Sequence, residues 1–236
     1  CDCTGLFRVI KLIICVLLLL LAAPVAQAAN LSPLVDANWL ATNLEHDDLI
    51  VLDIQNPRDY ARFHVPGAVN AHYGKWRTDK KDPTGPSMLP PVKRLEAMIG
   101  GLGIGNNQRV VIVATGRDAG DLAAAARVFW TFKVLGHGPV AVLDGGLAAW
   151  AQSRKPVEAG INSREPRKYI ARADLDLVLT ADEAKEFLES GMGFVDARSE
   201  GEFVGLYRGS KDERPGTIPG ARHLPHDWVT EDGTAR

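Results

Sequence analysis

The sequence predicts an α/β fold in which a central, mainly parallel sheet is flanked by helices, followed by the first half of a second such domain. Three observations lead to this prediction. Short runs of β-branched residues alternate with segments of helical periodicity, which is typical of parallel sheets. The strand candidates are apolar throughout, as strands covered on both faces are. A strand-and-turn pattern also occurs twice along the chain.

Most of the predicted elements lie in the first of these two units. Each strand is a short β-branched run, and each helix has apolar residues at helical spacing, with Leu122, Ala125, Phe129 and Phe132 on one face of the last helix. Trp130 and Trp150 are expected in the core. In chain order we expect a helix over Asp36–Glu45, a strand over Leu49–Asp53, a helix over Pro91–Leu102, a strand over Arg109–Val113, a loop over Thr115–Gly120 and a strand over Val140–Leu143.

The repeat links two distant parts of the chain. Leu49–Tyr60 and Gly193–Phe203 each contain an apolar strand that ends in an aspartate, followed by a polar turn with an aromatic residue. An apolar-Pro-Gly-Ala segment follows in both copies. The aspartate and this proline are 13 residues apart in the first copy (53 to 66) and 23 apart in the second (196 to 219), which indicates a ten-residue insertion. A helix over Thr180–Ser190 precedes the second strand, and Thr180 and Glu183 have the spacing of a capping box.

The first thirty residues have the pattern of an export signal. Arg8 and Lys11 precede the apolar run Leu12–Ala23, and the small-residue site Ala26–Ala28 follows. The run is shorter than the roughly 20 residues that a spanning helix needs, so we expect cleavage, no stable membrane anchor and a periplasmic location. The predicted organisation is a signal peptide over 1–28, a complete domain over 31–155, a linker over 156–174 and an incomplete domain over 175–236.

Charge and residue types argue against several classes of function. The chain has 27 basic and 29 acidic residues with no long basic run, so nucleic acid is not an expected partner. Its three cysteines, Cys1, Cys3 and Cys15, all precede the expected cleavage site, which leaves the mature chain without a thiol. Of six histidines only His223 and His226 are close in sequence, and we expect neither a metal nor another cofactor.

An ordered set of short motifs covers both units. The first unit carries Val51-Leu-Asp53, His64-Val-Pro-Gly-Ala68, Arg127-Val-Phe-Trp130, Leu135-Gly-His137 and Val142-Leu-Asp-Gly-Gly146. The second carries Val195-Asp-Ala-Arg198, Gly201-Glu-Phe203, Gly216-Thr-Ile-Pro-Gly-Ala221 and Glu231-Asp-Gly233. In this order the motifs resemble the rhodanese family, specifically its tandem-domain thiosulfate and 3-mercaptopyruvate sulfurtransferases, over nearly the whole mature chain.

The resemblance implies that sulfane sulfur is moved from a small-molecule donor to a thiophilic acceptor through a cysteine persulfide. In the family this cysteine lies at the end of a central strand, before a helix whose N-terminal N–H groups stabilise an anion. The matching position in the first unit is Ala114, which is no nucleophile, so the cysteine is expected beyond the end of this chain and the fragment itself is expected to be inactive. The loop that follows either holds an anion or only connects strand to helix, and we favour the connection. The alternative function is an inactive module that binds a sulfur anion or a protein partner.

Arg198 is the single candidate substrate-binding residue. The family often has an arginine near the position of Glu202 that helps to bind the anionic donor, and Arg198 lies four residues earlier. A structural role, in which Arg198 pairs with acids around the Asp196 turn, is the favoured alternative. Asp53 and Asp196 end their strands, so we expect their carboxylates to accept hydrogen bonds from the backbone of the next turn.

Overall fold

A computed structural model of the chain describes residues 31–208, 214–231 and 235–236, so the expected signal peptide lies outside the described residues. The predicted parallel sheet is confirmed. Its five strands are all parallel and follow the spatial order β1-β5-β4-β2-β3. The strands are β1 (Leu34–Val35), β2 (Leu49–Asp53), β3 (Val69–Asn70), β4 (Arg109–Val113) and β5 (Val140–Leu143).

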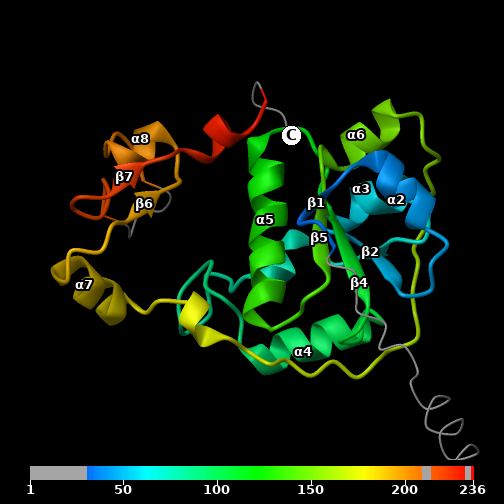
Figure 1. The fold of residues 1–236 in the computed structure, drawn as a ribbon, viewed down its shortest axis with the longest axis horizontal. Coiled ribbons are helices and arrows are strands. Elements are labelled where there is room, and N and C mark those ends of the chain that lie inside the picture. Colours follow the sequence, from blue (N-terminus) through cyan, green and yellow to red (C-terminus); the bar gives the residue numbers. More distant parts are fainter. Residues whose placement is uncertain (1–30, 209–213, 232–234) are drawn as a thin grey trace, which may run out of the picture. The chain divides into compact units, whose positions relative to one another are not determined.

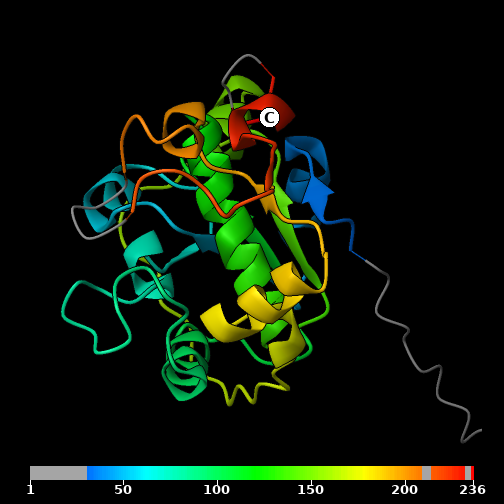
Figure 2. The same ribbon diagram turned by 90° about the vertical axis from the view of Figure 1, so that its left-hand side faces the viewer.

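Helices cover both faces of this sheet (Figure 1). The helix α5 lies lengthwise across one face, as Figure 2 shows, and α4 packs on the same side. The opposite face is covered by α2, α3 and α6. The bounds are α2 (Ala37–Asn43), α3 (Pro57–Arg62), α4 (Val92–Gly101), α5 (Ala119–Val134) and α6 (Gly146–Gln152), with a short 3-10 helix η1 (Tyr73–Trp76) packed against α5.

Alternation along the strands divides the core into two layers. Ile50 and Ile112 contact the α4 and α5 layer, whereas Val51 and Val111 contact the layer of α2, α3 and α6. Both sets are buried because successive residues of a strand point to opposite faces, which explains why these strands are apolar throughout. Residue 114 continues the first set, so the side chain of Ala114 lies on the α5 side.

The segment 156–174, expected to be a linker, runs along the first unit and contacts it repeatedly. Tyr169 is 5% exposed and belongs to the core layer of α4 and α5. Glu158 and His64 exchange backbone hydrogen bonds of 2.9 Å, and the backbone N–H of Arg167 donates to Gly100. We call residues 156–172 the strap, because they bind to this unit through both side chains and backbone.

The remaining described residues form a small parallel ladder with short helices. The predicted capping box is present: the Thr180 hydroxyl accepts from the N–H of Glu183, whose carboxylate accepts from the N–H of Thr180. Many apolar side chains are exposed here, including Val195 and Trp228. The elements are η2 (Leu175–Leu177), α7 (Ala181–Glu189), β6 (Val195–Asp196), α8 (Glu200–Phe203), β7 (Arg222–His223) and η3 (His226–Val229). Within the described residues, no helix is both long and apolar enough to cross a bilayer.

Candidate functional site at the carboxyl ends of β2 and β4

The order of the strands creates one natural place for a site. The chain leaves β2 toward the β3 edge of the sheet, and it leaves β4 toward the β5 edge. The loops that follow these two neighbouring strands therefore diverge, and a crevice opens between them at the carboxyl end of the sheet. In open α/β sheets ligands bind at this switch point.

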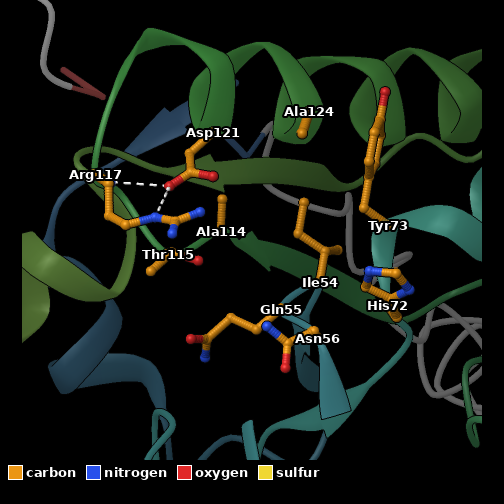
Figure 3. Close-up of a pocket in the computed structure, with 10 residues that line it drawn as sticks. All are labelled: Ile54, Gln55, Asn56, His72, Tyr73, Ala114, Thr115, Arg117, Asp121 and Ala124. Atoms are coloured by element: carbon orange, nitrogen blue, oxygen red, sulfur yellow. Dashed lines mark hydrogen bonds and ion pairs between the residues drawn. The ribbon is translucent and has the colours of Figure 1, made fainter. Parts of the chain in front are cut away.

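A cavity of about 200 Å³ lies at this point, between the loops that follow β2 and β4 (Figure 3). It is mostly polar, and its walls come from the two loops, from η1 and the residue before it, and from the first turns of α5. The lining residues are Ile54, Gln55, Asn56, His72, Tyr73, Ala114, Thr115, Arg117, Asp121 and Ala124. The predicted nucleophile position, Ala114, is thus part of the wall.

The loop after β4 is held in place by the turn before α6. The carbonyl oxygen of Ala114 accepts a hydrogen bond of 2.9 Å from the N–H of Leu147. Gly116 has φ of +84°, and a Cβ there would lie 2.1 Å from the carbonyl oxygen of Gly145. Only glycine tolerates both this φ and this close approach. The loop is therefore a fixed wall of the cavity.

Two carboxylates occupy the N-terminus of α5. Asp118 is the N-cap, and its side chain accepts from the N–H of Asp121. Asp121 in turn accepts from the backbone N–H and from Nε of Arg117, at 3.0 and 3.2 Å, and Figure 3 shows both contacts. The negative charges of these carboxylates reduce the positive potential at the N-terminus of α5, which would otherwise attract an anion. This arrangement favours the view that the loop connects strand to helix. The helix begins at Ala119, so the loop is shorter than predicted.

Gln55 lines the cavity on the β2 side, and the buried Asp53 next to it holds its side chain. As predicted, the Asp53 carboxylate accepts a hydrogen bond from the N–H of Gln55, at 2.8 Å, and it also accepts from Nε2 of Gln55. Burial raises the pKa of Asp53 to about 6, against the lowering effect of these hydrogen bonds. Oε1 of Gln55 is buried and has no hydrogen-bond partner among the described residues.

The cavity has no group that could carry a persulfide. Ala114 has only a methyl side chain, and none of the other lining residues contains sulfur. In the described part of the chain, no three His, Cys, Asp or Glu side chains are grouped so that they could hold a metal ion. The described side chains that line the cavity therefore cannot perform thiol chemistry.

The structure places Arg198 away from this cavity and in contact with an acid. No described residue after Ala124 lines the cavity. Arg198 Nη2 lies 2.6 Å from Oδ2 of Asp196 and also donates to the carbonyl oxygen of Gly216. The Arg198 guanidinium holds the pKa of Asp196 well below its usual range. The predicted turn bond from the Arg198 N–H to Asp196 is present, and these contacts favour the structural role of Arg198.

Two further predictions about single residues have different outcomes. Trp150 is fully buried, as expected. Trp130 is only partly buried, and its ring lies under the guanidinium of Arg127 rather than in the core. His223 and His226 contact backbone carbonyl oxygens of the turn after β6.

Sequence reasoning did not identify Gln55, His72 or Tyr73 as parts of the site. A signal existed for Gln55, because a polar residue two positions after a buried strand lies at the carboxyl edge of the sheet. His72 and Tyr73 reach the cavity only because η1 packs against α5, a contact between distant segments that the sequence does not reveal.

Comparison with known proteins gives a consistent result. The family model of the rhodanese-like domain matches residues 36–153. The 3-mercaptopyruvate sulfurtransferase of Homo sapiens is 33% identical over 205 residues, which cover 85% of this chain and 64% of that protein. The thiosulfate sulfurtransferase of Mus musculus is 33% identical over 225 residues, 85% of this chain and 71% of the relative.

A solved structure extends the similarity to the fold. SseA from Escherichia coli, described as having the rhodanese fold, superposes with a TM-score of 0.74 at 24% identity, over 85% of this chain and 78% of that chain. The chain thus spans about two thirds of the human relative's length while most of its own length is matched. The match to the domain model and the similarity to the sulfurtransferases agree with the fold. They show that the chain belongs to the rhodanese family.

Proposed function

We propose that the protein is a sulfurtransferase that moves sulfane sulfur from thiosulfate or 3-mercaptopyruvate to a thiophilic acceptor. The observation that supports this most directly is the similarity of 85% of the chain to sulfurtransferases with these two donors in their names. The described cavity contains no thiol. In our proposal residues 31–155 therefore act as a non-catalytic domain, and residues 175–236 begin the catalytic one.

The proposed reaction needs a cysteine that these 236 residues do not supply in the mature protein. A thiolate attacks the transferable sulfur of the donor, and the bond between that sulfur and the rest of the donor breaks. The electron pair of this bond leaves with sulfite, or with the enolate of pyruvate, which then takes up a proton, and a persulfide remains on the cysteine. The acceptor then takes the outer sulfur and the thiolate returns. No cysteine follows Cys15 in the sequence, so the proposal places this nucleophile beyond Arg236.

Formation of thiocyanate from thiosulfate and cyanide tests the proposal. The chain from Ala29 to Arg236, which carries no thiol, is expected to show no turnover above the uncatalysed rate. A protein extended beyond Arg236 to the length of the relatives is expected to turn over. Replacing thiosulfate by 3-mercaptopyruvate then distinguishes the two donors. Turnover by the shorter chain would contradict the assignment of the nucleophile. An inactive longer protein with both donors would favour an inactive binding module.

Export forms a second part of the proposal. It rests on the basic residues, the apolar run and the Ala26–Ala28 site at the start of the sequence. Mass spectrometry of the native protein is expected to find an N-terminus at or near Ala29 in the periplasmic fraction. A protein that retains Leu12–Ala23 would contradict this part of the proposal and leave the sulfurtransferase activity open to its own test.

A further inference from the structure

Two arginines on the α5 side of the first unit have no acidic partner among the residues that the structure describes. Arg77 follows η1, and Arg127 lies one turn along α5 from Ala124. Within the described residues, neither guanidinium has a carboxylate within 4.0 Å, although Arg109, Arg117 and Arg198 all do. Arg77 is exposed, whereas Arg127 is partly buried. Charged groups that are partly removed from water are normally paired, so the lack of an acidic partner at Arg127 needs an explanation.

Each of the two guanidiniums is stacked on an aromatic ring. Cζ of Arg77 lies 4.9 Å from the ring centroid of Tyr73, and Cζ of Arg127 lies 4.7 Å from that of Trp130. Figure 3 shows the ring of Tyr73 lying against α5 beside Ala124. Stacking fixes the plane of a guanidinium and leaves the N–H donors at its edge available.

Most of these edge donors have no hydrogen-bond partner in the described part of the chain. Nη2 of Arg127 makes one hydrogen bond, at 3.3 Å, to the carbonyl oxygen of Ser87. Nε of Arg127 is buried and has no hydrogen-bond partner among the described residues. Burial and the positive charge of Arg77 both lower the pKa of Arg127, so the two cations affect each other through space. An anion between them would relieve this repulsion and supply the missing acceptors.

The loop that carries Arg77 is held in one conformation. Thr78 is buried, and its backbone exchanges hydrogen bonds with Ser87 and Met88. Its hydroxyl donates to the carbonyl oxygen of Gly85 and accepts from the N–H of Met88. Ser87, whose carbonyl meets Arg127, has φ of 64°, a conformation that is uncommon for residues other than glycine. The backbone around both arginines is therefore held in place and need not move when a ligand binds.

The acids of the same loop are already occupied. Asp79 accepts from the backbone N–H of Lys81, at 2.8 Å. Asp82 accepts from the backbone N–H and the hydroxyl of Thr84. Both carboxylates fold back on their own turns and neutralise neither arginine.

We propose that Arg77 and Arg127 form a binding site for a small divalent oxyanion. Two planar guanidiniums, one exposed and one partly buried, suit an anion with several oxygens better than a monatomic halide. The proposed function would supply thiosulfate as the natural ligand. Only this choice of ligand, and not the site itself, rests on the proposed function. The site is distinct from the cavity at Ala114, although Tyr73 borders both.

Resonances of arginine Nε–H groups in the ¹⁵N-labelled protein test the site without any turnover. Sodium thiosulfate and sodium sulfate are titrated separately, with sodium chloride holding the ionic strength constant. We expect the Nε–H signals of Arg77 and Arg127 to shift and saturate with both anions. Arg77→Gln loses one charged hydrogen-bonding partner, which is expected to weaken binding by roughly tenfold or more. Arg127→Lys keeps the charge but loses the planar fork of donors, so a smaller weakening is expected.

The variants also protect the test against misfolding. Arg77 is exposed, so Arg77→Gln is expected to keep the fold even if Arg127→Lys disturbs the stacking on Trp130. Arg94→Gln removes an exposed arginine from α4 and is expected to bind both anions as the unaltered protein does. Shifts that do not saturate, or equal weakening in Arg94→Gln, would overturn the site. Saturation by sulfate, together with absent sulfurtransferase activity of the protein extended beyond Arg236, would keep the site and refute only the proposed function.

Discussion

His137 should make the protein less stable in acid. The imidazole is 2% exposed, and it packs beside Phe132 and Tyr169. Its Nε2 lies 2.9 Å from the carbonyl oxygen of Gln108, which can only accept, so Nε2 carries the proton. Nδ1 is buried without a partner among the described residues, and a second proton there would have no acceptor. Burial accordingly lowers the pKa of His137 from 6.5 to about 4.

The sign and size of the effect follow from linkage between protonation and folding. The unfolded chain binds a proton at His137 more readily than the folded one. The contribution of neutral His137 is therefore complete above pH 6.5 and is lost as the pH falls toward 4. At about 1.4 kcal/mol per pH unit, this interval corresponds to about 3 kcal/mol of unfolding free energy.

Asp53 acts in the opposite direction. Its pKa is raised from 3.8 to about 6, so its contribution is complete below pH 3.8 and is lost as the pH rises through 6. The two groups partly cancel between pH 4 and 6. A pH profile of the unaltered protein alone would therefore hide the effect of His137.

The variant His137→Phe isolates the histidine. At pH 7 it loses the hydrogen bond to Gln108 and should be about 1 kcal/mol less stable than the unaltered protein. At pH 4 it should be more stable, by about 2 kcal/mol, because no buried group remains to be protonated. Urea unfolding from pH 4 to 7 measures both values, with His46→Gln in an exposed loop as the control. Parallel curves for His137→Phe and the unaltered protein would refute the reasoning.

Three further predictions concern backbone, capping and charge. Gly116→Ala should lower the unfolding free energy by more than about 3 kcal/mol, since the new Cβ meets the Gly145 carbonyl. Gly85→Ala, with positive φ but open space, should lose about 1 kcal/mol; equal losses in urea would disprove the steric argument. Thr180→Ala should lose about 1 kcal/mol of capping, seen as faster hydrogen exchange in α7; unchanged exchange would contradict it. Carbon NMR should find the Asp53 carboxyl titrating near pH 6, and a midpoint near 3.8 would show that burial is not decisive.

The parts of the fold that could be predicted are those with a long local pattern. β2, β4 and β5 are apolar runs of four or five residues, and their predicted bounds match the structure. β1 and β3 have two residues each, too few to show any periodicity. Short α3 was missed although Asn56 and Pro57 are a favourable helix start.

The candidate site divides in the same way. Its position at the end of β4 and the absence of a nucleophile at Ala114 could be predicted, because both depend on one segment and a family resemblance. The position of Trp130 could not, because its spacing on α5 fits a core residue equally well. The ring of Trp130 is covered by the guanidinium of Arg127, which in turn contacts Ser87 of a distant loop. Contacts between distant segments determine such details.

The strap changes where the first unit should be considered to end. A protein engineer who cut the chain at residue 155 would remove Tyr169 from the core and Glu158 from its backbone pairing with His64. The smallest piece that keeps the core closed therefore extends to about residue 172, and a protease should cut more readily beyond Asp174 than within the strap. By the same reasoning, a fusion protein that carries this unit should include the strap if the unit is to keep its core closed.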